Sequence, residues 1–188
     1  LGTAQFGLTY GVANKTGQLS RELAAETVAI ARRGGISTLD TAIAYGQSES
    51  VLGAVGVGDM QVMTKLPPIP SGCADVDGWV EAQVAGSLDR LRVSHLHGLS
   101  FHRPEQLLEG KGRELYGAAR SLQARGIVEK IGISIYQPED LQRLLVDYRF
   151  DRVQAPCSFF DRRMLASGWL DRLDKMGCEL HARSVFLQ

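Results

Sequence analysis

Short apolar runs alternate along the chain with longer segments in which apolar residues recur at every third or fourth position. The short runs are typical of buried strands, and the longer segments are typical of amphipathic helices. Helix patterns cover residues 20–35, 48–56, 75–93, 112–128, 137–149 and 163–177. Strand patterns cover residues 1–7, 36–40, 60–65, 95–102, 130–134, 151–156 and 178–186. The chain is therefore predicted to alternate between strand and helix with seven strands.

Strict alternation of this kind favours a parallel sheet covered by helices. An open doubly wound sheet needs a glycine-rich phosphate turn leading directly into the first helix, and residues 6–18 lack that spacing. Repeats of roughly thirty residues suit an eight-stranded TIM barrel, which usually takes roughly 250 residues. We therefore expect residues 1–188 to form a single barrel domain with about seven β/α units, the eighth missing from this chain, and with the natural N-terminus absent.

Composition excludes several kinds of partner. Lys plus Arg and Asp plus Glu both number 21, so no basic surface suggests nucleic acid. No apolar run reaches the roughly 18 residues of a membrane span, and no signal-peptide pattern opens the chain. The three cysteines are odd in number and lack metal-site spacing, so we expect reduced thiols, a cytoplasmic protein and no metal.

Ionisable residues end three consecutive strand patterns. Asp40, Lys65 and His102 each follow several apolar or small residues. Because the carboxyl ends of neighbouring barrel strands meet at one rim, we expect these side chains to converge there, with Tyr45 in the loop above. Each residue alone favours a structural role, such as a cap, a solvated tip or a packed ring. The four together favour a site.

These four groups suit proton donation to an oxygen that gains negative charge. A free phenol has a pKa near 10 and donates poorly at pH 7. An adjacent ammonium is predicted to lower that pKa, a carboxylate to hold the ammonium, and an imidazole to orient a substrate oxygen. A carbonyl that receives hydride is such a substrate, and because the protein has no hydride source, a cofactor must supply it.

The motifs resemble those of the aldo-keto reductases. "LDTAIAYGQSE" is similar to that family's most specific signature, and "LGTAQFG", "MTK", "LSFHRP", "KIGIS" and "VQAP" follow in the family's order over nearly the whole chain. The resemblance implies a TIM-barrel NAD(P)H-dependent oxidoreductase that reduces small aldehydes or ketones. Its catalytic tetrad would be Asp40, Tyr45, Lys65 and His102, with Tyr45 as the general acid.

The resemblance also implies a cofactor site. It would consist of Gly2, Thr3, Ala4, Ser134, Gln154, Arg183 and Ser184 and would bind NADPH, with NADH as the other candidate. The sequence departs from the family in three places. Ile135 follows Ser134 where an asparagine is common, and Arg183 stands where a tyrosine stacks on the nicotinamide. After Gln154, Cys157 and Ser158 stand where the family has tyrosine and asparagine. A guanidinium can also stack on a flat ring.

Two further readings remain open. The substituted cofactor positions are compatible with a non-catalytic, nicotinamide-binding regulatory subunit of the same family. A lyase or aldolase would use Lys65 as a Schiff base, although a lysine paired with Asp40 stays charged and is a poor nucleophile. The particular carbonyl substrate and the oligomeric state are not encoded in these motifs.

Overall fold

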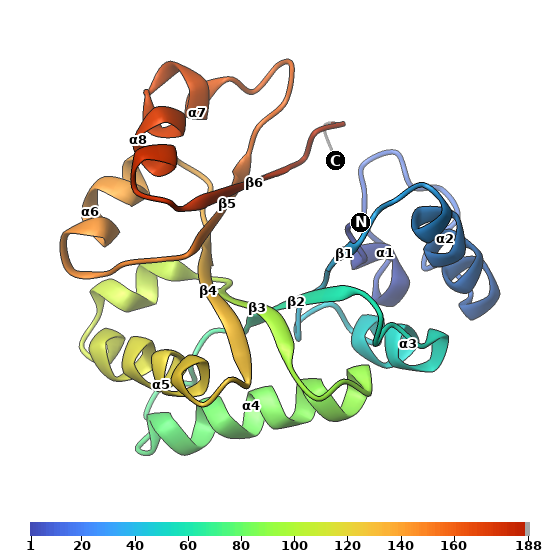
Figure 1. The fold of residues 1–188 in the computed structure, drawn as a ribbon, viewed down its shortest axis with the longest axis horizontal. Coiled ribbons are helices and arrows are strands. Elements are labelled where there is room, and N and C mark those ends of the chain that lie inside the picture. Colours follow the sequence, from blue (N-terminus) through green and yellow to red (C-terminus); the bar gives the residue numbers. More distant parts are fainter. Residues whose placement is uncertain (187–188) are drawn as a thin grey trace.

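The computed structural model describes residues 1–186 and contains one curved sheet of six parallel strands, arranged in chain order from β1 to β6. The strands are β1 (Thr38–Asp40), β2 (Gln61–Leu66), β3 (Leu96–Phe101), β4 (Val128–Ser134), β5 (Arg152–Pro156) and β6 (Glu179–Arg183). In Figure 1 they curve around the centre of the molecule with the helices outside. The fold is a partial TIM barrel, as the alternating pattern predicted.

Helices cover the outer face of the sheet. They are α1 (Ala4–Gly7), α2 (Arg21–Arg33), α3 (Ser48–Val55), α4 (Val76–Leu91), η1 (Pro104–Leu108), α5 (Gly112–Ala124), α6 (Glu139–Asp147), α7 (Arg163–Ala166) and α8 (Trp169–Lys175). The Ser20 hydroxyl caps α2 by accepting a hydrogen bond from the Leu23 backbone N–H, as a serine at this position should. Within residues 1–186 no helix has the length and apolar character needed to cross a bilayer.

The first predicted strand is mostly wrong. Of residues 1–7, only Gly2 pairs with β1, through a single parallel bridge to Asp40, and the chain then turns into α1. The turn begins at Thr3, whose backbone N–H and side-chain hydroxyl both donate to the Asp40 carbonyl at 3.0 Å. This places the N-terminal segment beside β1 without extending the sheet.

The predicted helix over residues 163–177 is also divided. Gly168 adopts φ +72°, a left-handed conformation that glycine tolerates, and it separates α7 from α8. The short 3₁₀ helix η1, after β3, was not predicted.

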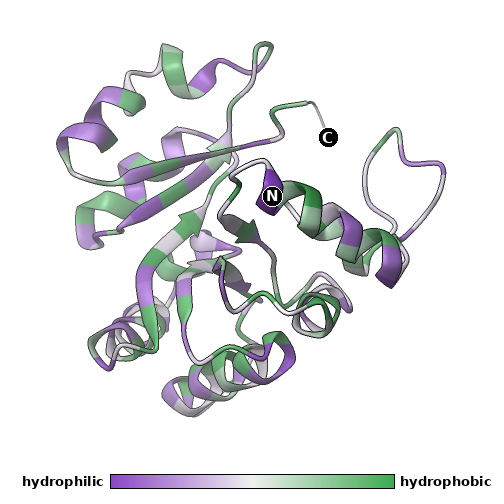
Figure 2. Ribbon diagram, turned by 45° about the vertical axis from the view of Figure 1, so that its right-hand side comes forward, coloured by the Kyte–Doolittle hydropathy of each residue, from purple (hydrophilic) through white to green (hydrophobic). Residues whose placement is uncertain are grey.

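The core lies between the sheet and its helices. Strand residues such as Leu99, Ile131 and Val153 are fully buried, and so are helix residues such as Val28 and Val84. Figure 2 shows hydrophobic residues along the strands and on parts of the helices, with hydrophilic residues between them. This packing fixes the strands in register, and the register decides which side chains meet at the rim.

Candidate active site

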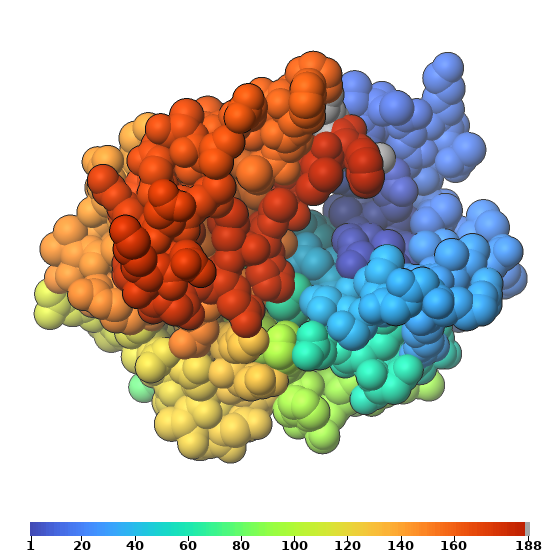
Figure 3. Space-filling view, turned by 45° about the horizontal axis from the view of Figure 1, so that its top comes forward, coloured from blue at the N-terminus to red at the C-terminus, as the bar shows by residue number. Residues whose placement is uncertain are grey.

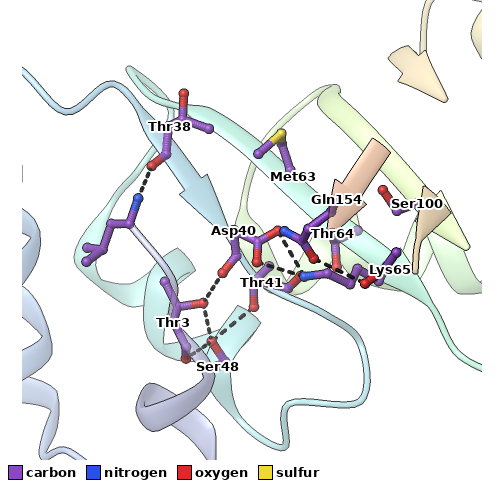
Figure 4. Close-up of polar contacts among 12 residues, drawn as sticks. Thr3, Thr38, Asp40, Thr41, Ser48, Met63, Thr64, Lys65, Ser100 and Gln154 are labelled. Atoms are coloured by element: carbon purple, nitrogen blue, oxygen red, sulfur yellow. Dashed lines mark hydrogen bonds and ion pairs between the residues drawn. The ribbon is translucent and has the colours of Figure 1, made fainter. Parts of the chain in front are cut away.

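A buried ion pair lies at the carboxyl ends of β1 and β2. The Lys65 ammonium, in a side chain only 1% exposed, donates to both Asp40 carboxylate oxygens at 2.9 and 2.8 Å and to the Thr41 carbonyl at 2.8 Å. Figure 4 shows the two side chains reaching toward each other from neighbouring strands. All three ammonium protons therefore have acceptors within the protein.

Tyr45 and His102 complete the cluster. The Lys65 ammonium nitrogen lies 5.0 Å from the centroid of the Tyr45 ring. The rings of Tyr45 and His102 meet edge to face, with centroids 5.8 Å apart. The structure thus brings together the four residues that the sequence singled out.

A buried hydroxyl network holds the loop that carries Tyr45. The Ser48 hydroxyl donates to the Thr3 carbonyl at 2.9 Å, and the Thr41 hydroxyl donates to Ser48 at 3.0 Å. Figure 4 shows this network linking the N-terminal segment to the loop. The loop is therefore tied at both ends: Thr41 follows β1 directly, and Ser48 opens α3.

Two glycines allow the same loop to pack against α1. A Cβ at Gly46, where φ is +54°, would lie 2.4 Å from the Gly7 carbonyl oxygen, and a Cβ at Gly7 would overlap the Tyr45 carbonyl oxygen. Contacts this short exclude any side chain at either position. The glycine after Tyr45 therefore gives the close approach that sets the position of the phenol.

Glu49 fixes α3, the helix that follows the Tyr45 loop, and the sequence patterns did not identify it. Its carboxylate is 2% exposed and accepts hydrogen bonds from Thr64 at 2.6 Å, Ser87 at 3.0 Å and Arg90 at 2.8 Å. These bonds join α3 to β2 and α4. The signal was a carboxylate next to the apolar run of α3, at a position that faces the sheet.

The pKa of Tyr45 is raised, contrary to the prediction. Burial of the phenol is the main cause, and the negative charge of Asp40 is the second. The positive charge of Arg183 acts in the opposite direction but does not offset them. The phenol is consequently held in its protonated form at neutral pH.

Burial is also the main cause of the pKa shifts of Lys65 and His102. It lowers the pKa of Lys65, although the Asp40 carboxylate opposes this shift. It lowers the pKa of His102 as well, and the nearby positive charge of Lys65 adds to the effect. Since the ordinary pKa of a histidine is about 6.5, the His102 imidazole is neutral at pH 7.

A cavity of about 690 Å³ adjoins the tetrad, between the N-terminal segment and β6. In Figure 3 these two parts of the chain, blue and red, face each other. Six of the seven predicted cofactor residues line the cavity together with Tyr45: Gly2, Thr3, Ala4, Gln154, Arg183 and Ser184. The seventh, Ser134, is not among the lining residues, but its hydroxyl donates to the Gln154 side-chain oxygen at 3.4 Å.

Arg183 is held at the edge of this cavity. Its guanidinium stacks on the Tyr136 ring, 4.2 Å from the centroid, and donates to the Ile135 carbonyl at 3.1 Å. The sequence allowed this guanidinium to stack on the nicotinamide ring of a cofactor. In the structure it stacks on a ring of the protein, that of Tyr136.

A second buried cation lies beneath the tetrad and was also missed. Arg152 is 1% exposed, donates to the Ser100 hydroxyl at 2.6 Å and contacts the Met63 sulfur. Gly98 and Gly132 leave room for it, since a Cβ on either would lie 3.2 Å from guanidinium atoms. Its position two residues before Gln154 in β5 was the signal, because alternate strand residues share a face.

The model of the aldo/keto reductase family matches residues 1–187. A putative aldo-keto reductase from Pseudomonas aeruginosa has a similar structure, with a TM-score of 0.77 and 24% identity over 96% of this chain and 70% of its own. The holo form of aldo-keto reductase AKR11C1 from Bacillus halodurans is similar as well, with a TM-score of 0.76 and 20% sequence identity. The match covers 98% of this chain and 60% of the Bacillus protein.

An aldo-keto reductase from Klebsiella pneumoniae, solved in complex with NADPH, gives a TM-score of 0.73 and 21% identity. It is covered over 62% of its length, and this chain over 97%. No curated protein matches this sequence. The structural likenesses, all at low identity, support the fold, whereas the family match extends along almost all of the sequence. The chain belongs to the aldo/keto reductase family.

Proposed function

We propose that the chain carries the catalytic tetrad of an NAD(P)H-dependent carbonyl reductase, with Tyr45 as the general acid. The observation that supports this most is the convergence of Asp40, Tyr45, Lys65 and His102 beside one cavity. The substrate class is a small aldehyde or ketone, in keeping with the family.

The cavity suits a nicotinamide dinucleotide. Residues 2–4 form one wall, and Gln154, Arg183 and Ser184 form another. The Gln154 amide, supported by Ser134, offers hydrogen-bonding groups for a carboxamide. When bound, the dinucleotide supplies the hydride, and the NADPH complex of the Klebsiella relative favours NADPH over NADH as the natural cofactor.

The chain's own residues handle the proton and the charge. Tyr45, protonated at neutral pH, donates its phenolic proton to the carbonyl oxygen as negative charge develops there. The neutral His102 imidazole donates a hydrogen bond to the same oxygen and so orients it. Lys65, kept charged and fixed by Asp40, places an ammonium beside the phenolate that forms.

A Schiff-base reaction at Lys65 is disfavoured. A nucleophilic lysine must be neutral and free to move, whereas this ammonium donates to three oxygens in a buried position. Borohydride trapping of a carbonyl compound on Lys65 would contradict this view.

The test is turnover of NADPH with a panel of aldehydes and ketones, followed by the loss of cofactor absorbance. We expect Tyr45→Phe to lower kcat by about 100-fold or more, because it removes the proton donor, while the affinity for NADPH stays within a few-fold. Tyr136→Phe, which keeps a ring beneath Arg183, is the matched control. Tight NADPH binding with no turnover on any carbonyl would instead favour the non-catalytic regulatory subunit.

A further inference from the structure

Ser48 joins three parts of the site through direct contacts. Its hydroxyl donates to the Thr3 carbonyl at 2.9 Å and accepts from the Thr41 hydroxyl at 3.0 Å. Its backbone N–H donates to the Tyr45 carbonyl at 3.0 Å. Figure 4 shows the Thr3 and Thr41 side chains both turned toward Ser48. One residue therefore contacts a wall of the cavity, the residue that follows β1 and the backbone of the proposed proton donor.

Two of these contacts lead on to the buried ion pair. The Thr41 carbonyl accepts a hydrogen bond from the Lys65 ammonium at 2.8 Å, so a single residue separates Ser48 from that ammonium. The Thr3 hydroxyl donates to the Asp40 carbonyl at 3.0 Å, and Thr3 also lies in the wall of the cavity. Ser48 is therefore one residue removed from each member of the ion pair.

The three hydroxyls form a chain with a fixed direction. The side chains of Thr3, Thr41 and Ser48 are all 0% exposed, so bulk water does not replace a partner. A hydroxyl has one proton to donate. Thr41 gives its proton to Ser48, and Ser48 gives its own to Thr3. Without the Ser48 hydroxyl, the buried Thr41 hydroxyl loses its acceptor and must turn toward another.

Other contacts already hold this loop in the fold. Glu49 joins α3 to β2 and α4, and the close approach of Gly7 and Gly46 holds the loop against α1. What the Ser48 hydroxyl adds is a link between the cavity wall and the loop that carries Tyr45.

We propose that Ser48 is a positioning residue whose hydroxyl couples the cavity wall at Thr3 to the placement of Tyr45 beside Lys65. Because residues 2–4 line the cavity, a ligand bound there bears on Thr3, and Ser48 passes a displacement of Thr3 on to the loop. The effect of Ser48 on turnover rests on the proposed function, whereas the coupling of Thr3 to Tyr45 does not.

The direct test observes the phenol without turnover. With 3-fluorotyrosine at position 45, the fluorine NMR signal reports the surroundings of the ring. We expect Ser48→Ala to shift or broaden this signal, because the loop loses its link to Thr3 and Thr41. Thr41→Val keeps the carbonyl that accepts Lys65 and nearly the same volume, and it should change the signal in the same way. The double variant should differ little from Ser48→Ala, since both changes break one chain.

The Thr3 side of the link is tested in the same spectrum. Thr3→Val should move the signal in the parent and much less in Ser48→Ala, where the link is already broken. Ser87→Ala is the matched control, because Ser87 is also a 0% exposed serine but its hydroxyl donates to Glu49 at 3.0 Å. This control should leave the fluorine signal in place.

The proposal is overturned by a signal that stays unchanged in both Ser48→Ala and Thr41→Val, or that Ser87→Ala disturbs as much. An equal effect of Thr3→Val with and without the Ser48 hydroxyl would also overturn it. If Ser48→Ala does not fold, the isosteric Thr41→Val decides alone.

Steady-state kinetics give the second test. We expect Ser48→Ala to lower kcat by about tenfold, while KM for the carbonyl and the affinity for NADPH stay within a few-fold, because a displaced proton donor slows the reaction more than it weakens binding. Equal losses of kcat in Ser48→Ala and Ser87→Ala would contradict a positioning role. If the parent reduced no carbonyl at all, the proposed function would fail, but the fluorine spectra would still decide whether Ser48 couples Thr3 to Tyr45.

Discussion

At the scale of single residues, Asp40 is the group on which the site depends. It compensates a lysine that is 1% exposed, and it is also the second cause of the raised pKa of Tyr45. One carboxylate thus keeps the ammonium charged and keeps the phenol protonated. Asp40 pairs with Met63 in the β1–β2 register, so Lys65, two residues further along β2, lies on the same face of the sheet as Asp40.

We predict that Asp40→Asn lowers the free energy of unfolding by about 3 kcal/mol, because a buried ammonium loses its only anionic partner among residues 1–186. Urea denaturation at pH 7 measures the loss. The matched control is Asp59→Asn, which breaks an exposed ion pair with Arg32 and should change stability far less. Equal losses in the two variants would contradict the picture of a buried, uncompensated charge.

The sequence identified the tetrad but not its electrostatics. Charged residues after apolar runs are visible in a pattern, so Asp40, Lys65 and His102 could be found from strand ends alone. The pattern cannot show that the phenol is buried or that the Asp40 charge acts on it, and for that reason the predicted direction of the Tyr45 pKa was wrong. Arg152 escaped notice because a single arginine in a strand is usually exposed.

At the scale of elements, the departure from prediction at the N-terminus arises where two backbones touch. Residues 1–7 have the composition of a strand, yet Gly7 lies against the Tyr45 loop so closely that the chain turns into α1. Local patterns do not encode a contact between segments about 40 positions apart. The helices α2 and α5, whose amphipathic patterns are local, were by contrast predicted to within a few residues.

We predict that Gly46→Ala destabilises the protein by more than about 2 kcal/mol, through both the left-handed backbone and the clash with the Gly7 carbonyl. Gly56→Ala is the matched control: Gly56 also has positive φ, at +79°, but a Cβ there meets nothing within 4 Å. It should cost about 1 kcal/mol from backbone strain alone. Thermal unfolding compares the two variants, and a similar loss in both would argue against the close contact.

At the scale of the whole molecule, the alternation of strand and helix was enough to predict a parallel sheet and a partial barrel. The same alternation did not predict the number of strands correctly, because residues 1–7 join the sheet through a single bridge at Gly2 and form no strand. The pattern also did not predict which side chains the barrel encloses. Its interior contains two buried cations, Lys65 and Arg152, and one of them has no carboxylate partner among residues 1–186.

The two cations should therefore differ in their contribution to folding. Among residues 1–186, only Ser100 and Met63 hold the Arg152 side chain, and its Nε–H has no acceptor there, so no ion pair with these residues offsets the cost of burying its charge. We predict that Arg152→Met leaves the free energy of unfolding unchanged within about 1 kcal/mol or increases it, since the lost hydrogen bond and the relieved desolvation are of similar size. Urea denaturation beside Asp40→Asn, which should be about 3 kcal/mol less stable than the parent, makes the comparison. A loss as large as that of Asp40→Asn would mean that the Arg152 charge is compensated after all, and that the barrel interior tolerates a cation only where an anion faces it.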